Sequence, residues 1–309
     1  MLNKTVIISL FLIITLMGCT TFDRKIPPET DPKLHYEIYG KGKPILFLHG
    51  FGGNVYSWKK IVGPLSEYYQ VILLDLQGFG KSPKPMDGDY SIRAQATLVK
   101  RFIQEHRLRD VTLAGNSLGG GVALLTMLDL SQEAPDLISS LILIDSIAYR
   151  QKLPFFIRFL KSDVGRFLLF ALPKNLQVWT ILSYAYFDDE KITEEAINAY
   201  ARPLRSTEGR HALVETARHL IPSNIDDTTE KFKNVRIPVL ILWGEKDKVV
   251  PQHVRDRLSE DFQHSRCTIF PATGHLPQEE RPKETGEQIL KFMREGLLSF
   301  HESCQTMKF

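Results

Sequence analysis

The chain has 309 residues, of which 43% are hydrophobic and 24% are charged, so its composition is that of a globular protein. This length is sufficient to bury a large core. The formal net charge is only +3 and the sequence has no long run of Lys or Arg, which argues against a nucleic-acid-binding protein.

The N-terminal segment has the pattern of an export signal. Lys4 precedes an apolar stretch, 6–17, which is too short to span a bilayer comfortably. The stretch leads into Leu16-Met17-Gly18-Cys19, and the whole segment resembles the signal peptide of bacterial lipoproteins.

This resemblance implies a particular processing and location. We expect residues 1–18 to be removed as a lipoprotein signal peptide, Cys19 to carry lipid, and 19–31 to form a tether between membrane and domain. The protein would then be anchored in a bacterial cell envelope, and Thr20 in place of an aspartate favours the outer membrane in a host with two membranes. An ordinary secretory signal and a retained N-terminal anchor are the alternatives.

Apolar strands alternate with helices over the first half of the chain. Strands are expected at 34–39, 44–48, 71–74, 111–114 and 141–144, and helices at 55–68, at 92–106 and directly after Ser117. Asn54 and Ser91 are the expected helix N-caps. This alternation predicts a mainly parallel sheet that is covered by helices on both faces.

The alternation stops after Asp145 and resumes near residue 239. The intervening sequence contains short, aromatic-rich helical segments and no convincing strand, so we expect a helical cap inserted into the core. The helical segments of this cap are expected at 153–160, 164–172, 176–186, 193–200 and 209–220. After it, strands are expected at 239–243 and 267–270, and helices at 252–262 and 282–298. The resulting domain prediction is a core of 32–146 and 234–299, a cap of 147–233 and a tail of 300–309.

Two cysteines remain besides Cys19. Cys267 lies in an expected strand and Cys304 lies in the tail. They could form a disulfide in an oxidising compartment or remain two separate thiols, and the sequence leaves both possibilities open.

One short motif indicates a catalytic nucleophile. Ser117 is the centre of Gly115-Asn116-Ser117-Leu118-Gly119, between an expected strand and an expected helix. A G-x-S-x-G at such a junction is typical of a nucleophile elbow, in which a strained turn exposes the serine hydroxyl. The alternative is a glycine-rich turn with an inert serine.

A serine nucleophile needs a base, and the base needs an acid that orients it. Asp247 and His275 both follow expected strands, and the order Ser, Asp, His along the chain is the order of a catalytic triad that follows a nucleophile elbow in a mainly parallel sheet. Because the carboxyl ends of parallel strands meet at one edge of a sheet, we expect Ser117, Asp247 and His275 to form a catalytic triad there. Asp145 also follows a strand and is the rival candidate for the acid.

The site also needs two donors for an oxyanion. The backbone N–H groups of Leu118 and Phe51 are the candidates, because Leu118 follows the nucleophile and Phe51 lies in a glycine-rich loop after an earlier strand. His49, in the same loop, is expected to be structural. We expect no cofactor and no metal site.

Together these motifs resemble those of the α/β-hydrolase superfamily, in its capped branch of esterases, lipases and meta-cleavage-product hydrolases. The resemblance rests on His49–Gly53, Asp75–Ser82, the elbow at Ser117, Gly244–Asp247 with Pro251, and Gly274-His275 with Pro277 and Glu280. It implies an α/β fold with an eight-stranded, mostly parallel sheet, helices on both faces and a helical cap.

The resemblance also indicates the reaction. Members with aspartate in place of Ser117 resemble epoxide hydrolases and haloalkane dehalogenases, so a serine here favours acyl transfer to water. We expect a serine esterase or lipase-like enzyme acting on a small-molecule ester with an apolar acyl group. The alternatives are a C–C bond hydrolase of the meta-cleavage-product type, whose subgroup usually has tryptophan where this chain has Leu276, and a non-catalytic ligand-binding protein on the same fold. The oligomeric state is left open.

The cap sequence combines aromatic and basic residues. Its apolar residues are expected to pack the cap and to line an acyl pocket. Interleaved with them are Lys152, Arg158, Lys161 and Arg166. This pattern also fits a basic amphipathic surface that faces a membrane, which we regard as the alternative.

Overall fold

In the computed structural model, which describes residues 33–295 and 302–307, eight strands form one sheet in the order β1-β3-β2-β4-β5-β6-β7-β8. The strands are Tyr36–Tyr39 (β1), Pro44–Leu48 (β2), Gln70–Leu74 (β3), Val111–Asn116 (β4), Ile138–Ile144 (β5), Val239–Gly244 (β6), Ser265–Phe270 (β7) and Glu302–Thr306 (β8). β1 pairs with β3 in antiparallel orientation, and the other paired strands are parallel. The predicted α/β-hydrolase fold, with its mostly parallel eight-stranded sheet, is confirmed.

The central strands are continuous apolar runs because helices cover both faces of the sheet. In β2, Ile45 and Phe47 belong to one buried cluster, whereas Leu46 and Leu48 belong to the other. The first cluster includes side chains of α2 (Lys59–Ser66) and α13 (Pro282–Glu295). The second includes side chains of α3 (Ile92–Glu105), α4 (Leu118–Glu133) and α11 (Gln252–Asp261).

Two helix starts use the predicted N-caps. The Asn54 side chain accepts a hydrogen bond from the amide of Tyr56 at 3.0 Å, and the Ser91 side chain accepts one from Ala94 at 3.2 Å. The first of these segments was predicted as one helix but is divided into a 3-10 turn, Val55–Trp58, and α2.

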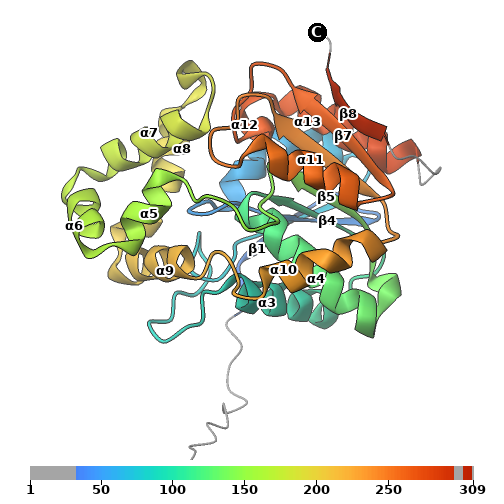
Figure 1. Cartoon of the computed structure of the whole chain (residues 1–309), viewed down its shortest axis with the longest axis horizontal. Coiled ribbons are helices and arrows are strands. Elements are labelled where there is room, and N and C mark those ends of the chain that lie inside the picture. Colours follow the sequence, from blue (N-terminus) through green and yellow to red (C-terminus); the bar gives the residue numbers. More distant parts are fainter. Residues whose placement is uncertain (1–32, 296–301, 308–309) are drawn as a thin grey trace, which may run out of the picture. The chain divides into compact units, whose positions relative to one another are not determined.

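Five helices form the cap between β5 and β6, and all five were predicted. They are α5 (Phe155–Lys161), α6 (Asp163–Ala171), α7 (Lys174–Ala185), α8 (Glu194–Tyr200) and α9 (Thr207–Arg218). Figure 1 shows them gathered at one end of the sheet. Short 3-10 turns, Asp189–Lys191 and Pro203–Arg205, connect α7 to α8 and α8 to α9.

Two short helices were not predicted. The first, α10 (Ile225–Thr229), is followed by a 3-10 turn, Glu230–Asn234, which leads back to the core. In this turn Phe232 stacks on Phe262 at the end of α11, with ring centroids 5.4 Å apart. The second, α12 (Pro277–Glu280), directly follows the loop of His275.

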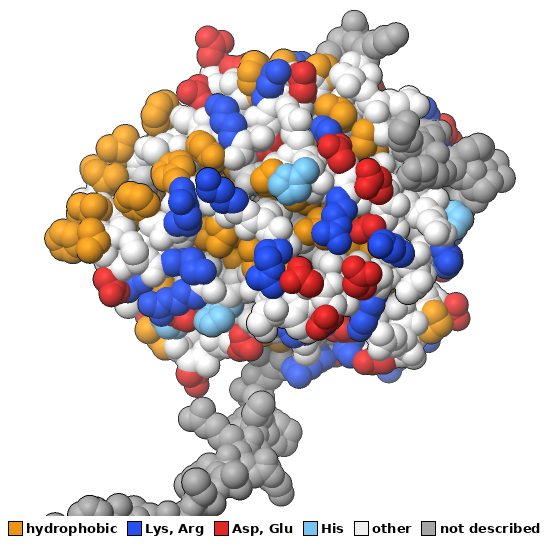
Figure 2. Space-filling model, viewed as in Figure 1, with side chains coloured by type: hydrophobic (Ala, Val, Ile, Leu, Met, Phe, Trp, Pro, Cys, Tyr) orange, Lys and Arg blue, Asp and Glu red, His pale blue; other side chains and the backbone are white. Residues whose placement is uncertain are grey.

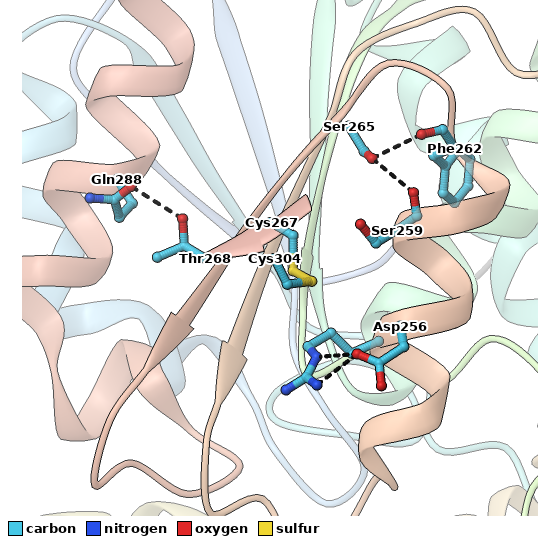
Figure 3. Close-up of a disulfide and its surroundings, with 9 residues drawn as sticks. Asp256, Ser259, Phe262, Ser265, Cys267, Thr268, Gln288 and Cys304 are labelled. Atoms are coloured by element: carbon cyan, nitrogen blue, oxygen red, sulfur yellow. Dashed lines mark hydrogen bonds and ion pairs between the residues drawn. A yellow bond between two sulfur atoms is a disulfide. The ribbon is translucent and has the colours of Figure 1, made fainter. Parts of the chain in front are cut away.

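The C-terminal segment differs from the prediction. The expected tail, 300–309, contains strand β8, which pairs in parallel with β7 and completes the sheet. Cys304 in β8 forms a disulfide with Cys267 in β7, as Figure 3 shows. The sequence Glu-Ser-Cys-Gln-Thr has no apolar periodicity, so the strand is specified by its pairing and by the disulfide. The possibility of a disulfide, left open above, is therefore realised.

None of the helices in the described residues is long and apolar enough to cross a membrane. The predicted signal peptide, 1–18, and the tether, 19–31, lie outside the described residues.

Candidate active site

Ser117 lies between β4 and α4, in the strained turn expected of a nucleophile elbow. Its φ of 54° is in the left-handed region that non-glycine residues rarely adopt. The turn is also too tight for larger neighbours. A Cβ atom on Gly115 would lie 2.3 Å from the backbone of Gly119, and one on Gly119 would lie 2.0 Å from the carbonyl oxygen of Leu48. The two glycines are therefore required by the close approach of backbone segments around the serine.

His275 and Asp247 form a buried hydrogen-bonded pair. The distance between His275 Nδ1 and Asp247 Oδ2 is 2.9 Å, and the side chains are 7% and 0% exposed. The other carboxylate oxygen, Oδ1, accepts hydrogen bonds from the amides of Val249 at 2.7 Å and Val250 at 3.2 Å. Both oxygens of Asp247 are thus occupied, so its orientation toward the imidazole is fixed.

Asp145, the rival candidate for the acid, is completely buried close to this pair and has a different hydrogen-bond partner. Its Oδ1 accepts a hydrogen bond from the amide of Gly244 at 2.9 Å, which ties the end of β5 to the end of β6. Burial, and then the neighbouring Asp247 carboxylate, raise the pKa of Asp145 well above its usual value. Asp145 therefore favours the neutral form more than an ordinary aspartate does. The carboxylate that contacts His275 Nδ1 is that of Asp247.

In the described residues, these three side chains are also the one group of potential metal ligands that lie close enough together to hold an ion. Ligand-type atoms of Asp145, Asp247 and His275 lie within 4.8 Å of one another. However, His275 Nδ1 is already hydrogen-bonded to Asp247, and the raised pKa of Asp145 opposes the deprotonated form that a ligating carboxylate needs. The donor set fits an acid–base pair better than a metal centre.

Ser117 and His275 line the same cavity, which encloses about 730 Å³ including its open mouth. The backbone amides proposed as oxyanion donors, those of Phe51 and Leu118, belong to residues of this cavity as well. Neither amide has a hydrogen-bond partner among the described residues. The structure thus brings together all five residues that the sequence analysis singled out around the serine: Ser117, Asp247, His275, Phe51 and Leu118.

His49 has the structural role that was expected. Its Nδ1 donates to the carbonyl oxygen of Gly50 at 2.8 Å, and its Nε2 accepts a hydrogen bond from the amide of Leu76 at 3.0 Å. Burial lowers the pKa of His49, so the imidazole is neutral and can make both bonds. It holds the loop that carries Phe51.

A buried carboxylate that sequence reasoning missed joins the cap to the core. Glu279 on α12 is 2% exposed and accepts hydrogen bonds from Ser57 at 2.8 Å and Tyr186 at 2.7 Å, and also from Tyr200. Burial raises the pKa of Glu279, while the hydroxyl groups oppose this rise. Tyr200 also lines the cavity, so the network supports one of its walls.

The next residue, Glu280, connects the cap to the loop of His275 by hydrogen bonds. Its carboxylate accepts hydrogen bonds from the amide of Gly274 at 2.8 Å and from the amide of Phe187 in the cap at 2.9 Å. The amide of His275 itself donates to the carbonyl oxygen of Ala185 at 2.6 Å. Glu280 was among the motif residues, but its contact with the cap could not be inferred from the sequence.

Comparison with known proteins identifies the class to which this fold and site belong. The family described as "alpha/beta hydrolase fold" matches residues 43–282, and the chain therefore belongs to the alpha/beta hydrolase family. Lipase 3 of Moraxella sp. (strain TA144) is 26% identical, over 96% of this chain and 99% of that protein. The 2-hydroxy-6-oxo-6-(2'-aminophenyl)hexa-2,4-dienoic acid hydrolase of Metapseudomonas resinovorans is 27% identical, over 82% and 85%. The solved structure of the epoxide hydrolase CorEH has a TM-score of 0.74 at 23% identity, covers 85% of this chain and 95% of its own, and shows likeness of fold.

Proposed function

We propose that this protein is a serine hydrolase that cleaves carboxylic esters of apolar acyl groups through an acyl-enzyme intermediate. The observation that carries the proposal is the 2.9 Å contact between His275 and Asp247, in a cavity that His275 shares with Ser117. A histidine that is oriented by a buried carboxylate and shares a cavity with a strained serine is the arrangement needed for nucleophilic catalysis.

The proposed mechanism uses only groups of this chain and water. Asp247 accepts the Nδ1–H of His275, so Nε2 is free to take the proton of the Ser117 hydroxyl as the oxygen attacks the ester carbonyl. The amides of Phe51 and Leu118 stabilise the resulting oxyanion. His275 then protonates the leaving alcohol, and a water molecule deprotonated by His275 releases the acid and restores Ser117.

The cavity walls support an apolar acyl group. Side chains from the cap dominate the cavity around Ser117: Leu153, Phe156, Ile157, Ile181, Leu182 and Leu220. A second apolar cavity of about 520 Å³ adjoins it and shares Phe51, Ile181, Leu182 and Tyr200. Together the two cavities provide an apolar space that begins at the serine and extends beneath the cap.

Hydrolysis of C–C bonds is the second candidate. It is supported by the similarity to the Metapseudomonas resinovorans hydrolase, whose name gives a hydroxy-oxo-dienoic acid as the substrate. The ester proposal has comparable support from Lipase 3 of Moraxella sp., which extends over more of the chain. The apolar lining described above fits a plain acyl chain better than a substrate with a carboxylate.

The test is a series of p-nitrophenyl esters of increasing acyl length, assayed with the wild type, Ser117→Ala and Ser131→Ala. Ser131 is an exposed serine on α4 and serves as the matched control. We expect turnover that Ser117→Ala abolishes and Ser131→Ala leaves unchanged, with a chain-length optimum that reports the size of the cavity. A folded protein without turnover on any ester would reject the proposal and direct the assay to C–C substrates and to ligand binding.

We also propose that Cys19 is lipidated after removal of residues 1–18, so that the protein is anchored in a bacterial cell envelope, in the outer membrane where the host has two membranes. The support is the sequence pattern ending in Cys19. The disulfide between Cys267 and Cys304 adds an independent argument, since disulfides persist mainly in oxidising compartments outside the cytosol.

A further inference from the structure

The outer surface of the cap exposes a cluster of large apolar side chains. Nine of the fourteen exposed large hydrophobic residues in the described part of the chain lie between residues 155 and 187. The most exposed are Phe167 and Val164, at 75% and 71%. We name as the cap patch the exposed apolar residues of α5, α6 and α7: Phe155, Phe159, Val164, Phe167, Leu168, Leu176 and Trp179.

This patch is too concentrated to be explained as scattered surface hydrophobicity. Single exposed apolar residues are normal on a protein surface, whereas contiguous ones mark an interaction site. Figure 2 shows hydrophobic side chains gathered over the edge formed by α6 and α7, with Lys and Arg side chains beside them. The cap patch therefore needs a partner, and its surroundings indicate the chemistry of that partner.

The charged residues of the segment that carries the patch are almost all positive. Residues 152–180 contain five cations and a single anion, Asp163, a net charge of +4 in a chain whose total is only +3. Asp163 is paired with Arg166. The other four cations have no ion-pair partner in the described residues: Lys152, Arg158, Lys161 and Lys174. The segment thus combines exposed apolar side chains with uncompensated positive charge.

We propose that the cap patch docks on an anionic lipid surface. Its apolar side chains would enter the boundary between headgroups and acyl chains, and the four unpaired cations would contact lipid phosphates. Trp179 suits this position because tryptophan is enriched at membrane interfaces. A second copy of the chain fits less well, because a two-fold interface would place the same positive surfaces against each other.

Docking of the cap patch would also determine where the cavity lies relative to the lipid surface. α5 contributes Phe156 and Ile157 to its lining, and α7 contributes Ile181 and Leu182. The same helices thus carry both exposed patch residues and residues that line the cavity. Docking would bring the cap wall of the cavity to the lipid surface, which holds whether or not the ester proposal is correct.

Tryptophan fluorescence of the full-length protein tests this directly. The chain has three tryptophans, of which Trp58 and Trp243 are fully buried and Trp179 is 44% exposed. The N-terminal residues 1–32 contain none, so a lipid anchor alone gives no signal. With vesicles that contain phosphatidylglycerol and brominated phosphatidylcholine, we expect quenching that Trp179→Phe abolishes. Vesicles without the anionic lipid should quench much less.

Two sets of variants distinguish the apolar and the charged contributions. Phe167→Ser combined with Leu168→Ser should lower the partition coefficient at least about tenfold, since both side chains lose their apolar contact. Lys161→Glu combined with Lys174→Glu should do the same through the charge term. Met86→Ser, at a residue of similar exposure outside the cap, is the matched control and should change nothing. Thermal unfolding curves confirm that each variant is folded.

Three results would overturn the inference. Protein that floats with the vesicles while Trp179 stays unquenched would show anchoring without docking of the patch. Equal quenching by zwitterionic and anionic vesicles would remove the role of the four cations. A dimer in solution, in which iodide fails to quench Trp179 before lipid is added, would assign the patch to a second copy of the chain.

Discussion

Replacing Asp247 by Asn reverses a single hydrogen bond at the candidate site. The amides of Val249 and Val250 donate to Oδ1, so the carbonyl oxygen of an asparagine has to take that place. Its NH₂ group then occupies the position of Oδ2, 2.9 Å from His275 Nδ1. Since an NH₂ group donates, Nδ1 must accept, and the imidazole proton moves to Nε2. That is the nitrogen which has to receive the proton of Ser117.

The expected cost follows from this change of tautomer. In a Ser-His-Asp triad the loss of the correct tautomer lowers kcat about 10⁴-fold. This corresponds to about 5.5 kcal/mol of activation free energy. The fold should be unaffected because the two side chains have nearly the same shape and both amides keep their acceptor.

The assay is steady-state hydrolysis of a p-nitrophenyl ester by the wild type, Asp247→Asn and Asp145→Asn, with thermal unfolding of each. Asp145→Asn should retain most of the activity, since an amide oxygen still accepts the hydrogen bond from Gly244. Near-normal kcat in Asp247→Asn together with an inactive Asp145→Asn would transfer the acid role to Asp145. Near-normal kcat in both would refute the triad.

Three further predictions concern stability and location. Cys304→Ser should lower the free energy of unfolding by about 3–4 kcal/mol, because the disulfide closes a loop of 37 residues. Urea titrations of the wild type and the variant, with and without reductant, measure this change. Equal unfolding midpoints for the oxidised wild type and the variant would contradict it. Because the folded-state pKa of Asp145 is raised above its unfolded value of about 3.9, the wild type should lose stability relative to Asp145→Asn as pH rises above about 4, by up to about 1.4 kcal/mol per unit until the raised pKa is reached. Parallel pH–stability curves of the two proteins would contradict the raised pKa. Cys19→Ser should release the protein from the membrane fraction, and continued sedimentation with membranes would indicate another anchor.

The parts of the fold that the sequence predicted are those with a local cause. Buried parallel strands need continuous apolar runs, which is why 44–48 was assigned with its observed ends. Asn54 and Ser91 were recognisable because an N-cap acts on an amide two or three residues away. The proximity of Asp247 and His275 followed from topology, since both stand at the carboxyl ends of neighbouring strands.

The parts that could not be predicted depend on partners far away in the chain. β8 has a polar sequence and forms beside β7 through backbone pairing and the bond between Cys304 and Cys267. Glu279 has partners 222 and 93 residues away, Ser57 and Tyr186, and no local pattern reports a contact over such a distance. The short helix that carries Glu279 has four residues, too few for a periodic signal.

The junction between the cap and the loop of His275 determines how the cap can move. Ala185 accepts the hydrogen bond of the His275 amide, and Glu280 bridges Phe187 and Gly274. A motion that separated these segments would displace the imidazole from Asp247. The cap can therefore open with the base in place only by rotating about this junction as a hinge.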